Sequence, residues 1–152
     1  MEGFGQGMEI ERTVTTSAPV EVVFGYLADF TTSTEWDPGT IRTIRVSGDG
    51  GVGTTYHNTS RFLGRQTELT YVVEQLVPAS VIRLRGENAT VIAHDTMTLA
   101  AGSSGGTVLT YRAAFSFQGL ARFVAPLLRP AFRRLGDDAE HGLRAALDRL
   151  AT

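Results

Sequence analysis

GLARFVAPLLRPAFRRLGDDAEHGLRAALDRLAT, residues 119–152, closes the chain and decides how the rest of the fold is interpreted. Its apolar residues recur at the 3.6-residue spacing of a helix, while charged residues occupy mostly the opposite face. Pro126 and Pro130 each remove a backbone donor, so a kinked start should precede a regular helix from about residue 127 or 131. The apolar stripe consists of Leu120, Phe123, Val124, Leu127, Leu128, Phe132, Leu135, Ala139, Leu143, Leu147 and Leu150. A long amphipathic helix of this kind needs an apolar surface to cover.

The preceding residues predict a sheet that supplies this surface. Period-2 alternation indicates strands over 10–16 and at about 41–47, 53–59, 62–76, 81–87, 90–99 and 107–117. Short, turn-rich separators join the last six strands, so neighbours in sequence should pair antiparallel. Helical spacing over 19–29 predicts one short helix, and a second should end at the Asp37-Pro38-Gly39 turn. The prediction is therefore an α+β fold in which a curved, seven-stranded antiparallel sheet wraps a long C-terminal helix, with two short helices after strand 1.

Composition limits the class of protein. The 152 residues suit a flexible, glycine-rich leader over 1–7 followed by a single domain over 8–152. A net charge of -2 provides no basic field for nucleic acid, and no apolar run is long enough for an integral membrane span. Cysteine is absent and the three histidines lie on separate predicted elements, so neither a metal nor a cofactor is expected. Without a secretory signal, a cytoplasmic location is the default.

Residues at the junctions between these elements resemble a known family. The matching stretches are Ser17 to Phe24 with Ala28-Asp29, Glu35 to Gly39, Gly53-Thr54, Glu74 with Pro78 before Ile82-Arg83-Leu84, and Gly106-Thr107. Together they resemble the polyketide cyclase/dehydrase and lipid-transport group of the START-like (SRPBCC, Bet v 1-like) superfamily, over about residues 8 to 150. The resemblance implies the helix-grip fold and a ligand cavity between the sheet and the C-terminal helix. Such families include cyclases, lipid carriers, receptors and regulators, so the resemblance leaves the reaction open.

Strand alternation places one carboxylate, Asp95, among apolar neighbours on the inner face of the predicted sheet. Burial would raise its pKa and suit it to general acid or base chemistry, whereas pairing with an arginine or capping a loop would make it structural. A bulge in the strand would turn His94 inward instead. Arg65 and Tyr71 share one face of their strand and are predicted to join Asp95, orienting ligand oxygens, although Arg65 could simply neutralise Asp95 and Tyr71 could simply pack in the core.

A further set of side chains is predicted to contact the ligand directly, because its members fall on the inward parity of a strand or on the helical stripe. Trp36 is assigned either to a wall of the cavity or to a plug at one end of the core. The set comprises Trp36, Tyr56, Asn58, Leu69, Met97, Tyr111, Phe115, Leu127 and Phe132.

Three functions compete. The first is binding of a small hydrophobic molecule, such as a polyketide, lipid or aromatic metabolite. The second is a cofactor-independent cyclase or dehydratase in the same cavity, with Asp95 or His94 moving protons. The third is a ligand-dependent regulatory or interaction protein, and a homodimer is compatible with all three. The arginine-bordered stripe over 120–135 also admits contact with a membrane surface, but core packing is preferred because the sheet otherwise lacks a cover.

Overall fold

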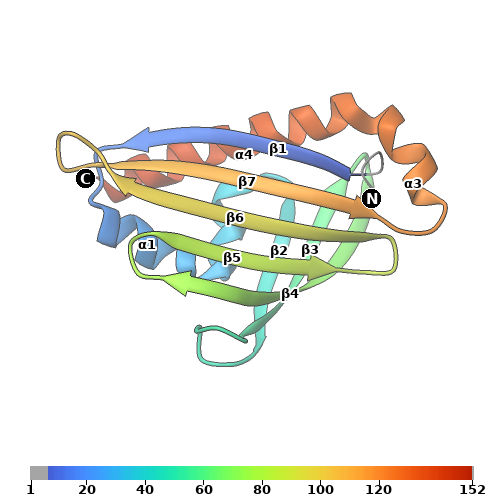
Figure 1. Ribbon diagram of the computed structural model, residues 1–152, viewed down its shortest axis with the longest axis horizontal. Coiled ribbons are helices and arrows are strands. Elements are labelled where there is room, and N and C mark those ends of the chain that lie inside the picture. Colours follow the sequence, from blue (N-terminus) through green and yellow to red (C-terminus); the bar gives the residue numbers. More distant parts are fainter. Residues whose placement is uncertain (1–6, 152) are drawn as a thin grey trace.

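An antiparallel sheet of seven strands is the framework of the molecule, which the computed structural model describes over residues 7–151. The strands lie in the order β1-β7-β6-β5-β4-β3-β2, so the first strand joins the sheet beside the last. Figure 1 shows that the sheet curves, with β2 and β3 crossing behind the other strands. The strands are β1 Gly7–Thr16, β2 Thr40–Ser47, β3 Thr55–Phe62, β4 Arg65–Val77, β5 Val81–Glu87, β6 Val91–Ala101 and β7 Thr107–Phe117. The predicted sheet is confirmed.

The helices form two groups. Three short ones stand between β1 and β2, namely α1 Val20–Ala28, η2 Phe30–Thr32 and α2 Ser33–Trp36. After β7 come α3 Ala121–Val124, the turn η3 Ala125–Leu128 and the long helix α4 Arg129–Leu150. Prolines explain the interrupted start of this last group, since each lies in the first positions of its helix, where a missing N–H costs no helical hydrogen bond. The predicted kinked start and long C-terminal helix are confirmed.

Helix α4 packs on the inner face of the sheet, and two glycines allow it to come close. A Cβ at Gly142 would lie 1.8 Å from the carbonyl oxygen of Trp36, and one at Gly136 would lie 2.4 Å from Ile10 Cγ2. Beyond these contacts, Leu143 and Leu147 of α4 are completely buried in the main core cluster. The helix is therefore held against α2 and β1 at van der Waals distance.

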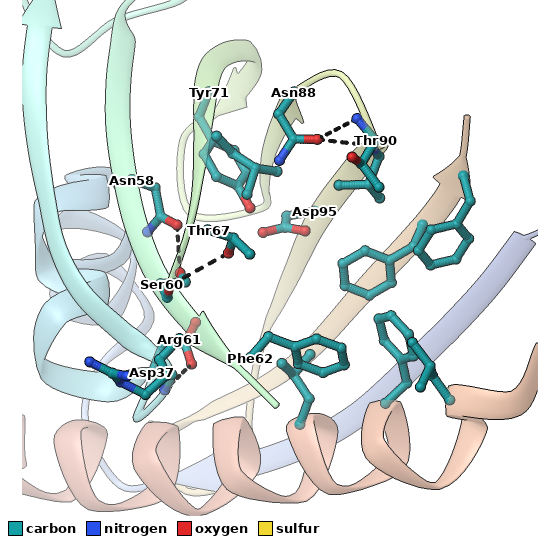
Figure 2. A pocket seen from close by; sticks show the side chains of 18 of the residues that line it. Asp37, Asn58, Ser60, Arg61, Phe62, Thr67, Tyr71, Asn88, Thr90 and Asp95 are labelled. Carbon is teal, nitrogen blue, oxygen red and sulfur yellow. Dashed lines mark hydrogen bonds between the residues drawn. The ribbon is translucent and has the colours of Figure 1, made fainter. Parts of the chain in front are cut away.

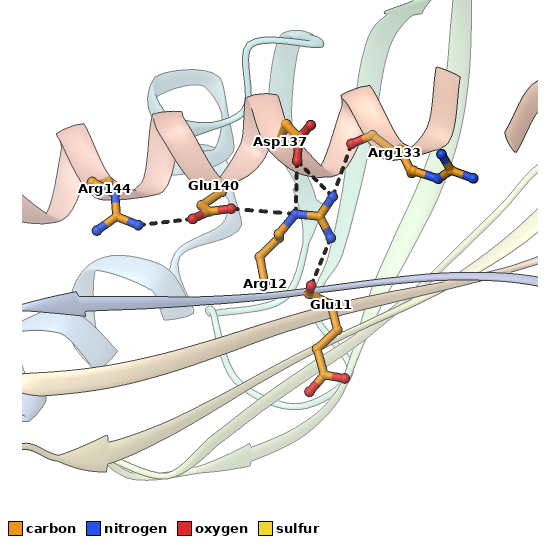
Figure 3. Close-up of polar contacts among 6 residues, drawn as sticks. All are labelled: Glu11, Arg12, Arg133, Asp137, Glu140 and Arg144. Atoms are coloured by element: carbon orange, nitrogen blue, oxygen red, sulfur yellow. Dashed lines mark hydrogen bonds and ion pairs between the residues drawn. The ribbon is translucent and has the colours of Figure 1, made fainter. Parts of the chain in front are cut away.

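Polar contacts along one side of α4 join it to β1 (Figure 3). The Arg12 guanidinium donates to Asp137 Oδ1 at 2.9 Å and to the carbonyl oxygen of Arg133 at 3.2 Å. Glu140 lies 3.5 Å from Arg12 and 3.0 Å from Arg144, so the charges form a short chain. Exposed pairs of this kind each stabilise a fold by about 1 kcal/mol or less, so they add little to stability. Their main effect is to fix the position of α4 along β1.

The turn between β3 and β4 differs from the prediction. Strands were expected to end at about residue 59 and restart at 62, with Arg61 in the turn, but Arg61 still belongs to β3 and pairs with Gln66. The chain reverses at Leu63 and Gly64, whose φ angles of 55° and 78° are both positive, as a two-residue type I′ hairpin requires. Leucine rarely adopts this conformation, so the residue types carry no turn signal here.

The first half of the C-terminal apolar stripe also differs from the prediction. Leu120, Phe123 and Leu127 are 81%, 65% and 78% exposed, whereas the stripe farther along α4 is buried. Figure 1 shows the reason, because α3 lies beyond the ends of the strands at the side opposite the C-terminus, where no sheet remains to cover. Within the described residues, no helix combines the length and the apolar character that crossing a bilayer would require.

The predicted leader falls mostly outside the described residues, which begin at Gly7. Gly7 belongs to β1 and pairs with Ser116 of β7. The division into a leader over 1–7 and a single domain over 8–152 stays a prediction.

Candidate functional site

A cavity of about 340 Å³ lies between the inner face of the sheet and the C-terminal helical segment. Its walls come from β3, β4, β6 and β7, from η2, α2 and the turn after α2, from the β5–β6 turn, and from α3, η3 and α4. Figure 2 shows polar side chains converging from the strands at one end and aromatic rings gathered at the other. The volume and the mainly apolar lining are those of a site for a small organic molecule.

Four phenylalanine rings build the apolar end. Phe132, in the first turns of α4, has its ring centroid 4.9 Å from that of Phe62, 5.1 Å from that of Phe115 and 5.6 Å from that of Phe117. Phe115 and Phe117 share the inward parity of β7, and Phe62 ends β3 just before the hairpin turn. Tilted and edge-to-face rings at these distances attract one another, so this wall is preorganised to receive a flat or aromatic group.

Asp95 lies at the polar end, on β6, where its side chain is directed into the cavity (Figure 2). It is 5% exposed, and within residues 7–151 its carboxylate takes part in no hydrogen bond or ion pair. Burial, followed by the negative charge of Asp37, raises the pKa of Asp95 to about 7. A carboxyl group with this pKa is present in both protonation states near neutral pH, which is the condition for moving protons in either direction.

Two tyrosines flank this carboxyl group. Tyr71 on β4 and Tyr111 on β7 are both buried and both line the cavity. Burial and the charge of Asp95 raise the pKa of each phenol well above its usual value, so both hydroxyls stay neutral donors. In the described part of the chain neither hydroxyl has a hydrogen-bond partner. The Tyr71 ring reaches this position because it packs over Gly86, where any Cβ would lie 2.5 Å from Tyr71 Cε1.

Trp36 contributes a further unpaired donor near the same end. Its ring lies edge-on to that of Tyr111, with centroids 5.7 Å apart, and lines the cavity. The indole Nε1 is buried without a hydrogen-bond partner among the described residues. An unpaired buried N–H costs about 1–3 kcal/mol, so a ligand oxygen within its reach would be stabilised.

Asn58 and Asp37 complete the polar lining but are already engaged with the protein. Asn58 donates to Thr43 Oγ1 at 2.8 Å and accepts from Ser60 Oγ at 2.7 Å. Asp37 accepts hydrogen bonds from the Gly39 N–H at 3.0 Å and from the Thr40 hydroxyl at 3.1 Å. Burial raises the pKa of Asp37 despite these bonds. The buried polar groups of the cavity that remain unengaged are therefore those of Asp95 and the neighbouring aromatic residues, while the exposed Arg61 also lines the cavity without an ion pair among the described residues.

Most of the residues predicted for the site do line the cavity, although contact of each with a ligand stays a prediction. β6 runs in regular register with both neighbours, so Asp95 and not His94 faces inward. The predicted residues that line the cavity are Asp95, Tyr71, Trp36, Asn58, Leu69, Tyr111, Phe115 and Phe132.

Four predicted positions are not part of the cavity wall. Arg65 has the expected parity but stands at the tip of the β3–β4 hairpin, where it is exposed. Leu127 lies on the outer side of η3, away from the sheet. Tyr56 and Met97 face inward, but they are buried in the core, and Tyr56 packs edge-on against Phe30 with centroids 5.8 Å apart. Alternation identifies the face of a strand correctly but not how far the cavity extends along it.

Other lining residues were missed by the sequence analysis. Arg61 was assigned to a turn, Phe62 to the start of the strand that follows it, and Asp37 only to a turn. Thr67 shares the inward parity of Leu69 and Tyr71, so the same alternation could have identified it. Leu128 and Leu135 were included in the helical stripe and line the cavity from that side.

This arrangement can bind and polarise an oxygen-bearing organic molecule. It offers one carboxyl group that can take or give a proton, phenol and indole donors around it, and an aromatic wall at the opposite end. Over residues 7–151, His, Asp and Glu side chains form no group of three or more that could hold a metal ion.

Comparisons with known proteins identify the family and the fold. A family model described as polyketide cyclase / dehydrase and lipid transport matches residues 8–152. No curated protein matches by sequence. The Zhui aromatase/cyclase from Streptomyces sp. R1128 has a similar structure at 17% identity, with a TM-score of 0.82 and 96% of each chain covered.

Two further solved structures share the fold at lower identity. A START superfamily protein from Mycobacterium smegmatis is 11% identical, with a TM-score of 0.78, covering 93% of this chain and 98% of that one. The di-domain ARO/CYC StfQ from the steffimycin biosynthetic pathway is 14% identical, with a TM-score of 0.74, and the match covers 97% of this chain and 53% of StfQ. At these identities the likeness concerns the fold.

Proposed function

This chain belongs to the polyketide cyclase / dehydrase and lipid transport family, and from that premise we propose that it binds one small, mainly apolar molecule in the cavity between the sheet and α4. The preferred ligand is a flat, polycyclic or polyketide-derived molecule that carries carbonyl or phenol oxygens at one end. Family membership supports the general class of ligand, and the arrangement of the lining residues supports the particular shape.

The observation that carries this proposal is the division of the cavity into two ends. Phe132 and its three neighbouring phenylalanine rings offer no polar atom, so they favour an apolar body. At the other end, the Asp95 carboxyl and the Tyr71 and Tyr111 hydroxyls have no partner within the described chain. Buried polar groups without partners are costly, and a ligand that satisfies them gains affinity and a fixed orientation.

Isothermal titration calorimetry with a hydroxyanthraquinone and with a saturated fatty acid tests the proposal. We expect the hydroxyanthraquinone to bind more tightly, because only it carries oxygens at the end of a rigid aromatic body. Tyr71→Phe should weaken its binding by about 3- to 10-fold, the effect of one lost hydrogen bond. Tyr26→Phe is the matched control, since the Tyr26 hydroxyl bonds to Glu35 outside the cavity. Equal affinity of Tyr71→Phe and wild type would contradict the orientation.

A second candidate function is catalysis of an aldol-type cyclisation followed by dehydration. The specific observation in its favour is the pKa of Asp95, about 7, beside two neutral phenols. The Asp95 carboxylate would remove a proton from the carbon next to a ketone, while Tyr71 or Tyr111 donates to the enolate oxygen. The carbanion then forms a carbon–carbon bond with a second carbonyl carbon, and the resulting alkoxide takes the proton held by Asp95 to become a hydroxyl group. In the dehydration, the Asp95 carboxylate removes a second proton from the same α-carbon and returns it to the hydroxyl as the carbon–oxygen bond breaks, which forms the double bond and releases water.

Heptane-2,4,6-trione provides a balanced test of this chemistry, since its cyclisation and loss of one water give 5-methylresorcinol. We expect wild type to accelerate formation of the phenol, with a rate that rises as pH passes through about 7, where Asp95 becomes ionised. Asp95→Asn should abolish the acceleration but still bind the hydroxyanthraquinone. Unchanged turnover in Asp95→Asn would remove Asp95 from the mechanism.

Several expectations from the sequence stay predictions. They are the absence of a metal and of a cofactor, the lack of nucleic-acid binding, a cytoplasmic location and a homodimer. The hypothesis of a ligand-dependent regulatory protein has no specific observation in its favour. It would be supported only by a change in assembly when the cavity is filled.

A further inference from the structure

Residues 119–135, here called the arginine-rich segment, present two different faces. Ala121, Ala125 and Leu128 line the cavity from the inside. Leu120, Phe123 and Leu127 project from the other side and are mostly exposed, as described above. Scattered apolar side chains on a surface are ordinary, but three large ones within eight residues form a continuous apolar feature. The segment therefore has an outer apolar face that the fold itself does not use.

The charge of this segment is as unusual as its apolar face. It contains Arg122, Arg129, Arg133 and Arg134, while all 16 acidic residues lie elsewhere in the chain. All four arginines are exposed, and in the described part of the chain none has a carboxylate within ion-pair distance. Figure 3 shows the Arg133 guanidinium pointing away from Asp137. A local charge of +4 thus stands on a protein of net charge -2.

Several arginines elsewhere in the described chain are paired, but Arg42, Arg45, Arg61 and Arg65 are also exposed without an ion pair. The segment is distinguished by having four unpaired arginines over residues 122–134 with no carboxylate among them. Arg12 bonds to Asp137, Arg112 to Glu9, and similar pairs join β4 to β5 and lie within α4. Inside the segment, the only contact found for the cations is that of Arg122, which lies 4.8 Å over the ring of Phe123. The guanidinium groups are therefore available to an external anion.

We propose that the arginine-rich segment docks on the surface of an anionic lipid bilayer. Leu120, Phe123 and Leu127 would enter the boundary between headgroups and acyl chains, and the arginines would contact lipid phosphates. Exposed apolar side chains interleaved with arginine, on a short helical segment, are typical of peripheral membrane contacts. A bilayer satisfies both features at once, since it offers apolar depth and a negative surface potential.

The charge pattern favours a bilayer over a second copy of the chain. Apposing two such segments would bring eight arginines together with no carboxylate between them, and like charges in contact disfavour association. An anionic bilayer, in contrast, attracts every one of these groups.

Docking in this way would place the cavity directly beside the membrane. The residues that would touch the lipid and those that line the cavity belong to the same short segment, on opposite sides of it. An apolar ligand could then pass between the bilayer and the cavity without crossing bulk water. The surface contact itself needs no ligand, so it can fail or succeed independently of the proposed cavity function.

Co-sedimentation of the full chain with vesicles tests the proposal. Vesicles of equal parts phosphatidylglycerol and phosphatidylcholine are compared with vesicles of phosphatidylcholine alone, at low and high salt. We expect binding to the anionic vesicles only, and a loss of at least tenfold in apparent affinity at high salt, because screening removes the attraction of exposed charges.

Two pairs of substitutions test whether vesicle binding depends on the arginine-rich segment. Arg129→Gln with Arg133→Gln, and separately Phe123→Ser with Leu127→Ser, should each reduce vesicle binding by at least tenfold. The control pair Val46→Ser with Val52→Ser removes apolar side chains that are 62% and 65% exposed elsewhere, and should leave it unchanged. Hydroxyanthraquinone binding, measured on the same variants, reports whether the cavity is intact.

The proposal is overturned if wild type binds neutral and anionic vesicles equally, or if both segment variants bind as tightly as the control. It is also overturned if vesicle binding is absent and Phe123→Ser with Leu127→Ser abolishes a dimer seen by light scattering, because the face would then belong to a second copy. Selective binding to an acidic protein without any to vesicles would contradict it equally.

Discussion

Asp95 stands opposite Leu84 of β5 and Ala113 of β7 in the sheet register, so both neighbouring positions are apolar. Its ionisation is therefore governed by burial and by the charge of Asp37, and both act in the same direction. The tyrosines at the same end remain protonated for the same reason. At the scale of single residues, the cavity combines one titratable carboxyl with neutral donors that have no other partner.

The pH dependence of the protein's stability should reveal the ionisation of Asp95. In the unfolded chain Asp95 has a pKa near 4, and in the folded chain its pKa is about 7, so folding stabilises the protonated form. The stabilisation that protonated Asp95 gives the folded state is complete below about pH 4 and is lost as pH rises to about 7. The free energy of unfolding should fall by up to about 4 kcal/mol over this range. Asp95→Asn removes this titration, so the free energy of unfolding of the variant should lack that decline when urea melts are compared from pH 4 to pH 8. Parallel pH profiles for the two proteins would contradict the assignment.

Gly86 is predicted to affect stability and ligand binding by leaving room for the Tyr71 ring. Gly86→Ala would place a Cβ 2.5 Å from Tyr71 Cε1, so the ring must move and its hydroxyl must leave the polar end. We expect a loss of about 1–3 kcal/mol in stability and about tenfold weaker binding of the hydroxyanthraquinone. In a Tyr71→Ala background the same substitution should have little effect, since the clash is gone. An equal cost in both backgrounds would show that Gly86 acts by another route.

At the scale of elements, the position of α4 sets the depth of the cavity. Gly142 lets α4 approach the backbone of Trp36, and Arg12 fixes the opposite side of the helix to β1. Phe132 and Leu135, in the first turns of the same helix, then close the cavity. Any change that lifts α4 should therefore alter both stability and ligand binding.

Gly142→Ala tests this dependence. A Cβ there would lie 1.8 Å from the Trp36 carbonyl oxygen, which is backbone and cannot rotate aside, so we expect a loss of about 2–3 kcal/mol in unfolding free energy. Gly25→Ala in α1 is the matched control, since nothing lies within 4 Å of its Cβ position. There the higher helix propensity of alanine should add about 0.5–1 kcal/mol. Chemical denaturation of both variants distinguishes the two effects, and equal destabilisation would contradict the close packing of α4.

Periodicity predicted the elements well because it depends on which side of a strand or helix is apolar. It identified Asp95, Tyr71 and Phe115 as inward, and all three line the cavity. It could not show where the sheet ends, so Arg65 was placed inside although the hairpin turn at Leu63 leaves it exposed at the tip.

At the scale of the whole molecule, the two ends of the C-terminal segment have different roles. The regular part of α4 fills the core, whereas α3 and η3 extend past the sheet and present Phe123 and Leu127 outward. The sequence pattern is continuous across both parts, so it predicted one buried stripe. Only the three-dimensional length of the strands divides that stripe into a core portion and an exposed portion.

Titration of Trp36 fluorescence with a hydroxyanthraquinone tests the central claim most directly, because Trp36 is the single tryptophan and lines the cavity. The informative comparison uses two Thr→Phe substitutions on β4, of which Thr67 lines the cavity and Thr70 is exposed. We predict saturable quenching for wild type and Thr70→Phe, and at least tenfold weaker binding for Thr67→Phe, whose new ring fills the space. Equally tight binding by Thr67→Phe and Thr70→Phe would show that the ligand does not occupy this cavity.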